Sequence, residues 1–137
     1  MILVDTGAMV ALVDASDRHH ALVRSLYEEN PDAWILPAVV LPEVDYLVTK
    51  YLGAKAAETF LADLAAGAFS VEWGHDEDLA DAHRLCARYR SLRMGLVDAM
   101  VIAAAERLKA GAIATLDLRH FGAVSIKGSP RLLPRDR

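Results

Sequence analysis

Four acidic residues stand where their carboxylates could act together. Asp5 ends the apolar run "MILV", and Asp117 ends the apolar run "AIATL". Glu43 and Asp98 lie inside the apolar helical stretches "VVLPEVDYLV" and "GLVDAMVIAAA". A charged group on an apolar helix costs several kcal/mol to bury unless it is paired or binds a metal. These positions make Asp5, Glu43, Asp98 and Asp117 the candidate catalytic and metal-ligating residues.

Converging carboxylates repel one another unless a cation offsets their charge. The chain has a single cysteine, Cys86, so a cysteine-based metal site is excluded and oxygen ligands remain. Oxygen ligands suit a hard ion such as Mg²⁺ or Mn²⁺. Such an ion can activate water and stabilise the leaving oxygen of a phosphodiester. The four acids therefore predict metal-dependent phosphodiester hydrolysis.

Each acid also has a purely structural explanation. Asp5 and Asp98 could cap the helices that follow them. Glu43, directly after Pro42, could interact with a helix dipole as a first-turn acid. Asp117 could cap a turn at "DLRH". The metal hypothesis requires all four to converge, whereas the structural explanation does not.

Short apolar segments separated by helical patterns predict the scaffold for these acids. Such alternation is typical of an α/β fold with a mainly parallel sheet that helices cover on both faces. In open parallel sheets, ligands bind beyond the carboxyl ends of the strands, where Asp5 and Asp117 fall. The predicted strands are 1–4, 33–36, 69–73, 112–116 and an edge strand at 123–126. The predicted helices are 7–14, 16–30, 38–53, 54–67, 76–90 and 95–111.

Length and composition predict one soluble domain spanning residues 1–137. The start lacks a basic leader, and no apolar run reaches the roughly 20 residues that span a bilayer, so we expect neither a secretory signal nor a membrane segment. The lone cysteine fits a reducing, cytoplasmic setting. A hydrophobic content of 54% is compatible with a self-association or partner surface. The net charge of −4 argues against unaided wrapping of nucleic acid.

The other polar residues give weaker signals. The densest basic cluster has two explanations, a solvated helix end or contact with phosphates. The histidines, His120 included, lack the spacing of zinc ligands and are set aside. Asp14 could lie at the rim of the site, whereas Asp45 should face away from it. The basic cluster consists of Arg84, Arg88, Arg90 and Arg93.

The acids and their neighbours resemble the motifs of PIN-domain proteins, and within that family the VapC toxins of bacterial toxin–antitoxin pairs. The resemblance covers nearly the whole chain, with its motifs in order and at fitting spacing. The segments that carry it are "ILVDTGAMVAL", "LPEVDYLV", "GLVDAMVIAAAE", "IATLDLRHF" and the late "RLLP".

This resemblance implies a metal-dependent endoribonuclease with a three-layer α/β/α sandwich. Asp5 and Asp98 would ligate Mg²⁺ or Mn²⁺ most directly, and Glu43 and Asp117 would complete the site or hold a second ion. Metal-activated water would cleave RNA, although the preference for RNA over DNA comes only from the resemblance. It also implies a homodimer that a cognate VapB-like antitoxin neutralises.

Two hydroxyls belong to the same resemblance. Thr115, two residues before the last acid, and Thr6, directly after the first, match positions that would orient ligands or water. Gly7 departs from the serine that the family often has there, which affects only that secondary contact.

Two other protein classes share an acid at the end of the first strand. A haloacid-dehalogenase-like phosphohydrolase needs a second acid two residues after the first, where this chain has Gly7. A Mg²⁺-binding receiver-like signalling module would match Lys127, which follows the predicted strand 123–126. Receivers also need paired acids at the first strand, but Thr6 follows Asp5, and "FSVEWG" offers no phosphoacceptor aspartate. Both alternatives fit the residues less well.

Overall fold

The strands of this chain form one parallel sheet. A computed structural model describes the whole chain, residues 1–137. The sheet has five strands in the order β3-β2-β1-β4-β5, and every neighbouring pair is parallel. The strands are β1 (Ile2–Val4), β2 (Trp34–Pro37), β3 (Ser70–Glu72), β4 (Ala112–Ala114) and β5 (Arg131–Leu133).

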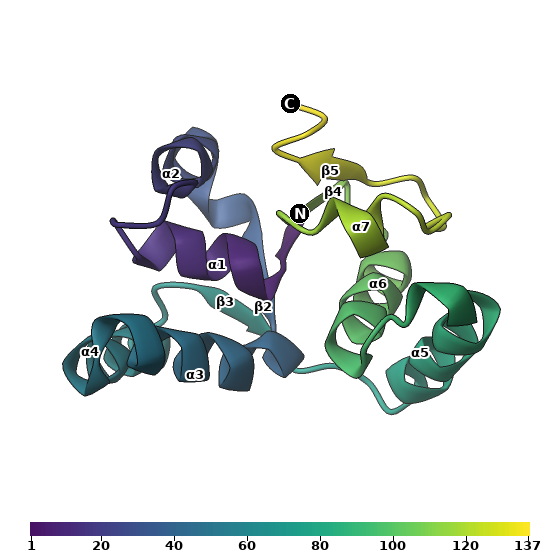
Figure 1. Cartoon of the computed structure of the whole chain (residues 1–137), viewed down its shortest axis with the longest axis horizontal. Helices are drawn as coiled ribbons and strands as arrows, with labels where there is room; N and C mark the ends of the chain where they lie inside the picture. Colours follow the sequence, from purple (N-terminus) through teal and green to yellow (C-terminus); the bar gives the residue numbers. More distant parts are fainter.

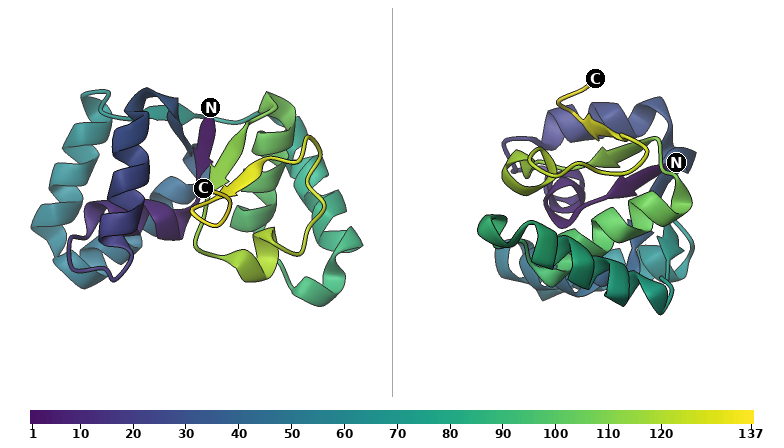
Figure 2. Two further views of the ribbon diagram at one scale, coloured as in Figure 1. Left: turned by 90° about the horizontal axis from the view of Figure 1, so that it is seen from above. Right: turned by 90° about the vertical axis from the view of Figure 1, so that its right-hand side faces the viewer.

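Helices cover both faces of the sheet, which confirms the predicted α/β class and its layered arrangement. The first four helices lie on one face, and α5, α6 and α7 lie on the other (Figures 1 and 2). None of them has the length and apolar composition to cross a membrane. The α-helices are α1 (Thr6–Val13), α2 (His20–Glu29), α3 (Leu41–Leu52), α4 (Ala54–Ala65), α5 (Glu77–Arg88), α6 (Leu96–Leu108) and α7 (Leu118–Phe121). Short 3₁₀ turns are η1 (Pro31–Ala33), η2 (Ala38–Val40) and η3 (Arg90–Leu92).

The central strands are buried on both faces, as their uninterrupted apolar sequences predict. Leu3, Val4 and Ile113 are fully buried within one continuous hydrophobic core. Trp34 in β2 belongs to the same core and meets the ring of Tyr27 edge-on, with ring centroids 5.4 Å apart. This packing holds β1 and β4 in the middle of the sheet, where the candidate acids follow them.

The prediction of an edge strand at 123–126 is wrong, because this segment is a loop and β5 forms the sheet edge instead. Burial does alternate along it, with Val124 and Ile126 buried. One amide within it and the amide directly after it, however, bond to side chains: Ser125 N donates to Tyr89 Oη (3.0 Å), and Lys127 N donates to Glu106 Oε2 (2.8 Å). A strand-like alternation of burial therefore arises here without strand pairing.

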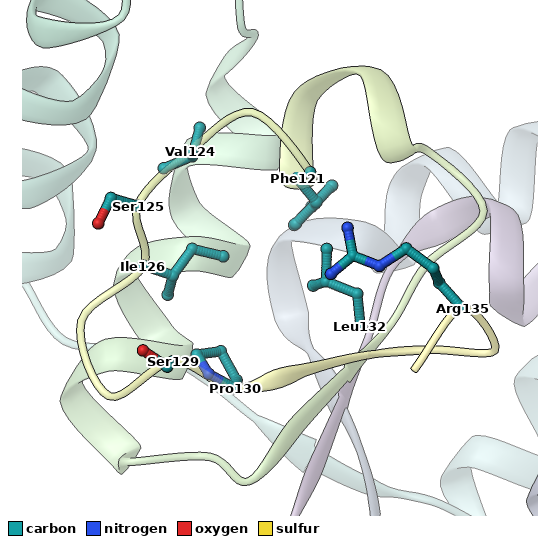
Figure 3. A pocket seen from close by; sticks show the side chains of 9 residues that line it. Phe121, Val124, Ser125, Ile126, Ser129, Pro130, Leu132 and Arg135 are labelled. Carbon is teal, nitrogen blue, oxygen red and sulfur yellow. The ribbon is translucent and has the colours of Figure 1, made fainter. Parts of the chain in front are cut away.

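The loop encloses a pocket of about 190 Å³ on the outer side of β5. Figure 3 shows Phe121, Ile126 and Leu132 around it and Arg135 reaching over it. Its lining contains no carboxylate, histidine or cysteine, so this pocket has no metal-ligating chemistry.

An ion-pair network joins α6 to α5 and β3. Arg107 Nε donates to Asp78 Oδ1 (2.9 Å), and its Nη2 donates to Asp78 Oδ2 (3.0 Å) and Glu72 Oε1 (2.8 Å). Asp78 is almost fully buried and also accepts from His75 N (3.0 Å). Every polar atom of the Asp78 carboxylate is therefore matched by a donor, as a buried charge requires.

We expect Arg107→Met to destabilise the protein by about 3 kcal/mol, because it leaves the buried Asp78 carboxylate without its partner. Urea unfolding measures this loss. The double variant Arg107→Met/Asp78→Asn should regain part of it, since the unpaired charge is gone. Arg84→Met is the matched control, because Arg84 pairs with Asp81 on an exposed face of α5. Equal losses in Arg107→Met and Arg84→Met would contradict the role assigned to burial.

Candidate metal centre

The pairing of β1 with β4 places Asp5 beside the segment that carries Asp117. Val4 lies opposite Ala114 in the register, and Asp5 N donates to Ala114 O (2.9 Å). The Thr115 hydroxyl then donates to Asp5 Oδ2 (2.9 Å) and accepts from Asp117 N (3.0 Å). The predicted convergence of these two acids at adjacent strand ends is confirmed as a geometric fact.

This point is also where the chain path reverses across the sheet. The connection after β1 leads to β2 on one side, and the connection after β4 leads to β5 on the other. Such a topological switch point opens a crevice at the carboxyl ends of the strands. Helices from both faces reach this end of the strands, so α3 and α6 can each contribute a residue there (Figure 1).

Glu43 and Asp98 come from the first turns of those two helices. The Thr6 hydroxyl donates to Glu43 Oε1 (2.6 Å), which ties α3 to the residue after Asp5. Asp98 is partly buried, and its Oδ2 lies 2.9 Å from His120 Nδ1. We call Asp5, Glu43, Asp98 and Asp117 the acidic cluster.

His120 belongs to this site, although the sequence analysis set it aside. Its Nδ1 lies 3.0 Å from Asp117 Oδ2 as well as 2.9 Å from Asp98 Oδ2, and its Nε2 lies 3.1 Å from Leu92 O. Asp117 caps α7 by accepting from His120 N (3.2 Å), so one helical turn brings both side chains to the same place. The Asp-x-x-His spacing in "DLRH" was the available signal, but it matches no zinc motif.

The hydrogen bonds of His120 define where its protons lie. A carbonyl oxygen only accepts, so Nε2 carries a proton toward Leu92 O. Nδ1 faces one carboxylate oxygen of Asp98 and one of Asp117, so the ring lies between the two acids.

The pKa of Asp5 responds to burial and to the charges of the neighbouring acids. The pKa of Asp5 is raised from 3.8 to about 6, mainly by burial, although the hydrogen bond from Thr115 opposes the rise. The carboxylates of Asp98 and Asp117 contribute to this rise. Asp5 is therefore a carboxyl group whose ionised form lacks a cationic partner within the protein.

Asp98 behaves in the same way. Burial raises its pKa, and the carboxylates of Asp117 and Glu43 add to the rise, while His120 opposes it. The carboxylates of Asp98, Asp117 and Glu43 thus raise the pKa of another acid in the cluster, and Asp5 and Asp98 are the acids whose pKa is raised. A cation in the crevice would relieve this repulsion.

The donor set fits a divalent cation. One ligand atom each from Asp98, Asp117 and His120 lies within 4.8 Å of the other two. Carboxylate oxygens with one imidazole nitrogen suit Mn²⁺, and the carboxylates alone suit Mg²⁺. This group contains Asp98, Asp117 and His120, whereas the family resemblance implies the most direct ligand roles for Asp5 and Asp98. The individual ligand roles remain predictions.

The helix-capping explanation holds for Asp117 but not for Asp5 or Asp98. The side chain of Asp5 makes no capping hydrogen bond to α1, and Gly95 rather than Asp98 is the N-cap residue of α6. Asp117 does cap α7, so capping and a metal role coincide there. Asp14 ends α1, at the far end of the helix from Asp5, and accepts from Ser16 (2.6 Å), so it is not at the rim of the site.

Comparison with known proteins gives the family. A model of the PIN domain matches residues 2–127 of this chain. Ribonuclease VapC26 from Mycobacterium tuberculosis is 33% identical over 130 residues, which make up 95% of this chain and 96% of that protein. This chain therefore belongs to the PIN-domain family. Its identity to VapC26 places it in the VapC group of that family, as the sequence motifs predicted.

Solved structures share the fold. VapC20 from Mycobacterium tuberculosis, described as a toxin that cleaves the sarcin–ricin loop, superposes with a TM-score of 0.82 at 23% identity, covering 93% of this chain and 98% of that one. DNA-bound VapBC from Salmonella typhimurium gives a TM-score of 0.71 at 17% identity, covering 96% and 95%. The receiver alternative loses its remaining support, because Lys127 follows a loop and not a strand.

The raised pKa of Asp5 has a consequence for stability in the absence of divalent metal. The folded chain holds the Asp5 proton more tightly than the unfolded chain, so this group lowers stability as pH rises from 3.8 to about 6. We expect Asp5→Asn in EDTA to raise the free energy of unfolding by about 1–3 kcal/mol near pH 7, and to give no such gain near pH 4.

Urea unfolding of both proteins at the two pH values tests this expectation. Only the difference between variants is informative, because other carboxyls act in the opposite sense. The bond from Arg135, for example, holds the pKa of Asp136 at about 2, which favours folding as pH rises. Asp45→Asn, on an exposed part of α3, is the control. A gain for Asp5→Asn that is equal at both pH values would contradict the burial argument.

Proposed function

We propose that this protein is a metal-dependent endoribonuclease toxin of the VapC type, active as a single domain in the cytoplasm. The observation that carries the proposal is the acidic cluster at the switch point of a PIN fold, with Asp98, Asp117 and His120 close enough to share one ion. The identity to a named ribonuclease over nearly the whole chain supports RNA as the substrate.

We propose Mg²⁺ as the resident ion, with Mn²⁺ as a substitute, held by Asp98 and Asp117 together with Asp5 and Glu43. When bound, such an ion lowers the pKa of water and stabilises charge on the leaving oxygen of a phosphodiester. Without it, the acidic cluster repels the phosphate of any RNA that approaches. This repulsion makes the reaction strictly dependent on the metal.

The remaining residues of the site orient the acids. Thr115 holds one oxygen of Asp5, so only the other oxygen is free to face the crevice. Thr6 does the same for Glu43 and fixes α3 relative to β1. His120 spans Asp98 and Asp117 and is itself anchored to the carbonyl of Leu92. This preorganisation reduces the reorganisation that substrate binding would otherwise require.

We also propose a cognate VapB-like antitoxin as the partner and a homodimer as the assembly. Solved relatives include toxin–antitoxin complexes, among them one from Klebsiella pneumoniae. In this chain, α3 and α4 expose large apolar side chains, one of which, Leu52, lines a groove of about 430 Å³. Exposed apolar surface of this kind marks protein interaction sites. The exposed residues are Tyr46, Tyr51, Leu52 and Leu61.

Antitoxin-free protein should cleave end-labelled total RNA into discrete fragments with Mg²⁺ or Mn²⁺, and EDTA should abolish the cleavage. Asp98→Asn should lower the rate by about 10²-fold or more, because it weakens the site that holds the cation. Denaturing gel electrophoresis of the RNA measures both effects.

Two controls make this test decisive. Asp45→Asn changes an exposed acid of α3 outside the cluster and should cleave like the unmodified protein. Calorimetric titration with Mn²⁺ reports metal binding without a substrate. Cleavage that persists in EDTA, or in Asp98→Asn, would overturn the assignment of the cluster as the catalytic centre.

His120 should matter through the acids that it orients. We expect His120→Phe, which keeps an aromatic ring without nitrogen, to lower nuclease activity or metal affinity roughly 10–100-fold. His120→Asn places an amide near the position of Nδ1 and should retain more activity. Mn²⁺ half-saturation and cleavage rates should be measured for both variants. Unchanged metal dependence in His120→Phe would show that His120 has no part in the site.

A further inference from the structure

The arginine cluster predicted from the sequence separates into two kinds of residue in the structure. Arg84 is paired with Asp81, and the Arg88 guanidinium lies over the ring of Tyr89, 5.4 Å from its centroid. Arg90 and Arg93 are exposed and form no ion pair. Proximity in sequence therefore hides a difference: two of these cations are engaged, and two are free.

The free pair is attached directly to the acidic cluster. Arg90 begins the turn η3, which ends at Leu92, and the Leu92 carbonyl accepts from His120 Nε2 (3.1 Å). Arg93 follows Leu92 in the left-handed backbone region (φ 51°), where the chain turns toward α6. The Cys86 thiol contacts Met94 O (3.5 Å), which holds the other side of this turn against α5.

A third free arginine lies beside His120, the residue that donates to the Leu92 carbonyl. Arg119 directly precedes His120 in α7, is exposed and also forms no ion pair. Helices α6 and α7 lie side by side on this face of the sheet (Figures 1 and 2). The bond between His120 and Leu92 therefore brings Arg119 near the turn that carries Arg90 and Arg93.

Of the arginines elsewhere in the chain, Arg18 and Arg131 form no ion pair, and the others are paired with acids. Arg24 pairs with Glu28, Arg137 with Glu29, and Arg135 with Asp136. In a chain of net charge −4, unpaired guanidinium groups beside an acidic crevice are the groups available to hold an anion. An RNA chain that crosses the acidic cluster carries such anions on either side of the phosphate to be cleaved.

We propose that Arg90, Arg93 and Arg119 form a basic rim that binds the RNA backbone phosphates next to the scissile one. This inference rests on the proposed ribonuclease function and adds the residues that position the substrate. Phosphate contacts of this kind fix the register of the nucleic acid without reading its bases. The rim borders the α6–α7 side of the crevice, so it defines the side along which the RNA enters or leaves.

Binding of a fluorescein-labelled oligouridylate tests the rim separately from catalysis. Fluorescence anisotropy is measured with Ca²⁺ in place of Mg²⁺, from about 50 to about 200 mM salt, because contacts with single-stranded phosphates each contribute about −0.7 to the slope of log K against log salt. The rim variant is Arg90→Gln/Arg93→Gln/Arg119→Gln. The matched control, Arg24→Gln/Arg84→Gln/Arg137→Gln, removes the same charge from arginines that are already paired.

We expect the rim variant to bind with a slope that is shallower by about 2 and the control to keep the slope of the unmodified protein. Each single rim substitution should weaken binding roughly two- to fivefold, and replacement by Lys should preserve the slope. In cleavage assays with Mg²⁺, the rim variant should raise KM more than it lowers kcat. Circular dichroism and a thermal melt confirm that the variants are folded.

Two results would overturn the rim. The rim variant could keep the slope of the unmodified protein, or the rim and control variants could lose the same amount, which would reflect total charge alone. If the unmodified protein cleaves RNA in either case, only the rim is wrong and the ribonuclease function stands. If the unmodified protein neither binds the oligouridylate nor cleaves total RNA, the proposed function and the rim both fall.

Discussion

The parallel register between β1 and β4 is the constraint on which the rest of the site depends. Each of these strands has only three residues, so few ladder hydrogen bonds define the register. Complete burial of Leu3 and Ile113 defines it more strongly, because a slip by one residue would move each side chain to the opposite face of the sheet, where the close-packed core has no matching space for it. The same slip would remove Asp5 from Thr115. Core packing therefore determines the position of the carboxylates.

The acidic cluster works against the stability that this core supplies. Asp5 is buried beside two other carboxylates, and the donor that favours its ionised form is the neutral hydroxyl of Thr115. Buried Asp78 shows the opposite solution, since Arg107 pairs with it and its pKa stays below the ordinary value. The fold thus contains one buried acid with a cationic partner, Asp78, and one without, Asp5. Buried charges without a partner usually lie at functional sites, and Asp5 lies where a bound cation can supply the missing charge.

The sequence was sufficient to predict the parts of the structure that depend on local pattern. Apolar strands that end on Asp5 and Asp117 could be recognised because parallel sheets collect strand ends at one edge. The false strand at 123–126 shows the limit of that reasoning. Val124 and Ile126 alternate with exposed residues, but only the three-dimensional structure reveals that Tyr89 and Glu106 bind the amides of this segment. The alternation of apolar and polar residues predicts which side chains are buried, but it does not predict whether the backbone pairs with a neighbouring strand.

The charged side chains show why the rest of the site could not be predicted. His120 matches no zinc motif, because two of its three partners, Asp98 and Leu92, lie 22 and 28 residues away in the chain. Charge density along the sequence likewise grouped Arg84 with Arg93, although the first is neutralised by its neighbour on α5 and the second is not. An arginine can bind an anion only if tertiary contacts have not already paired it with an acid. In this fold the contact between His120 and Leu92 places unpaired arginines beside the acidic cluster, where they can bind such an anion.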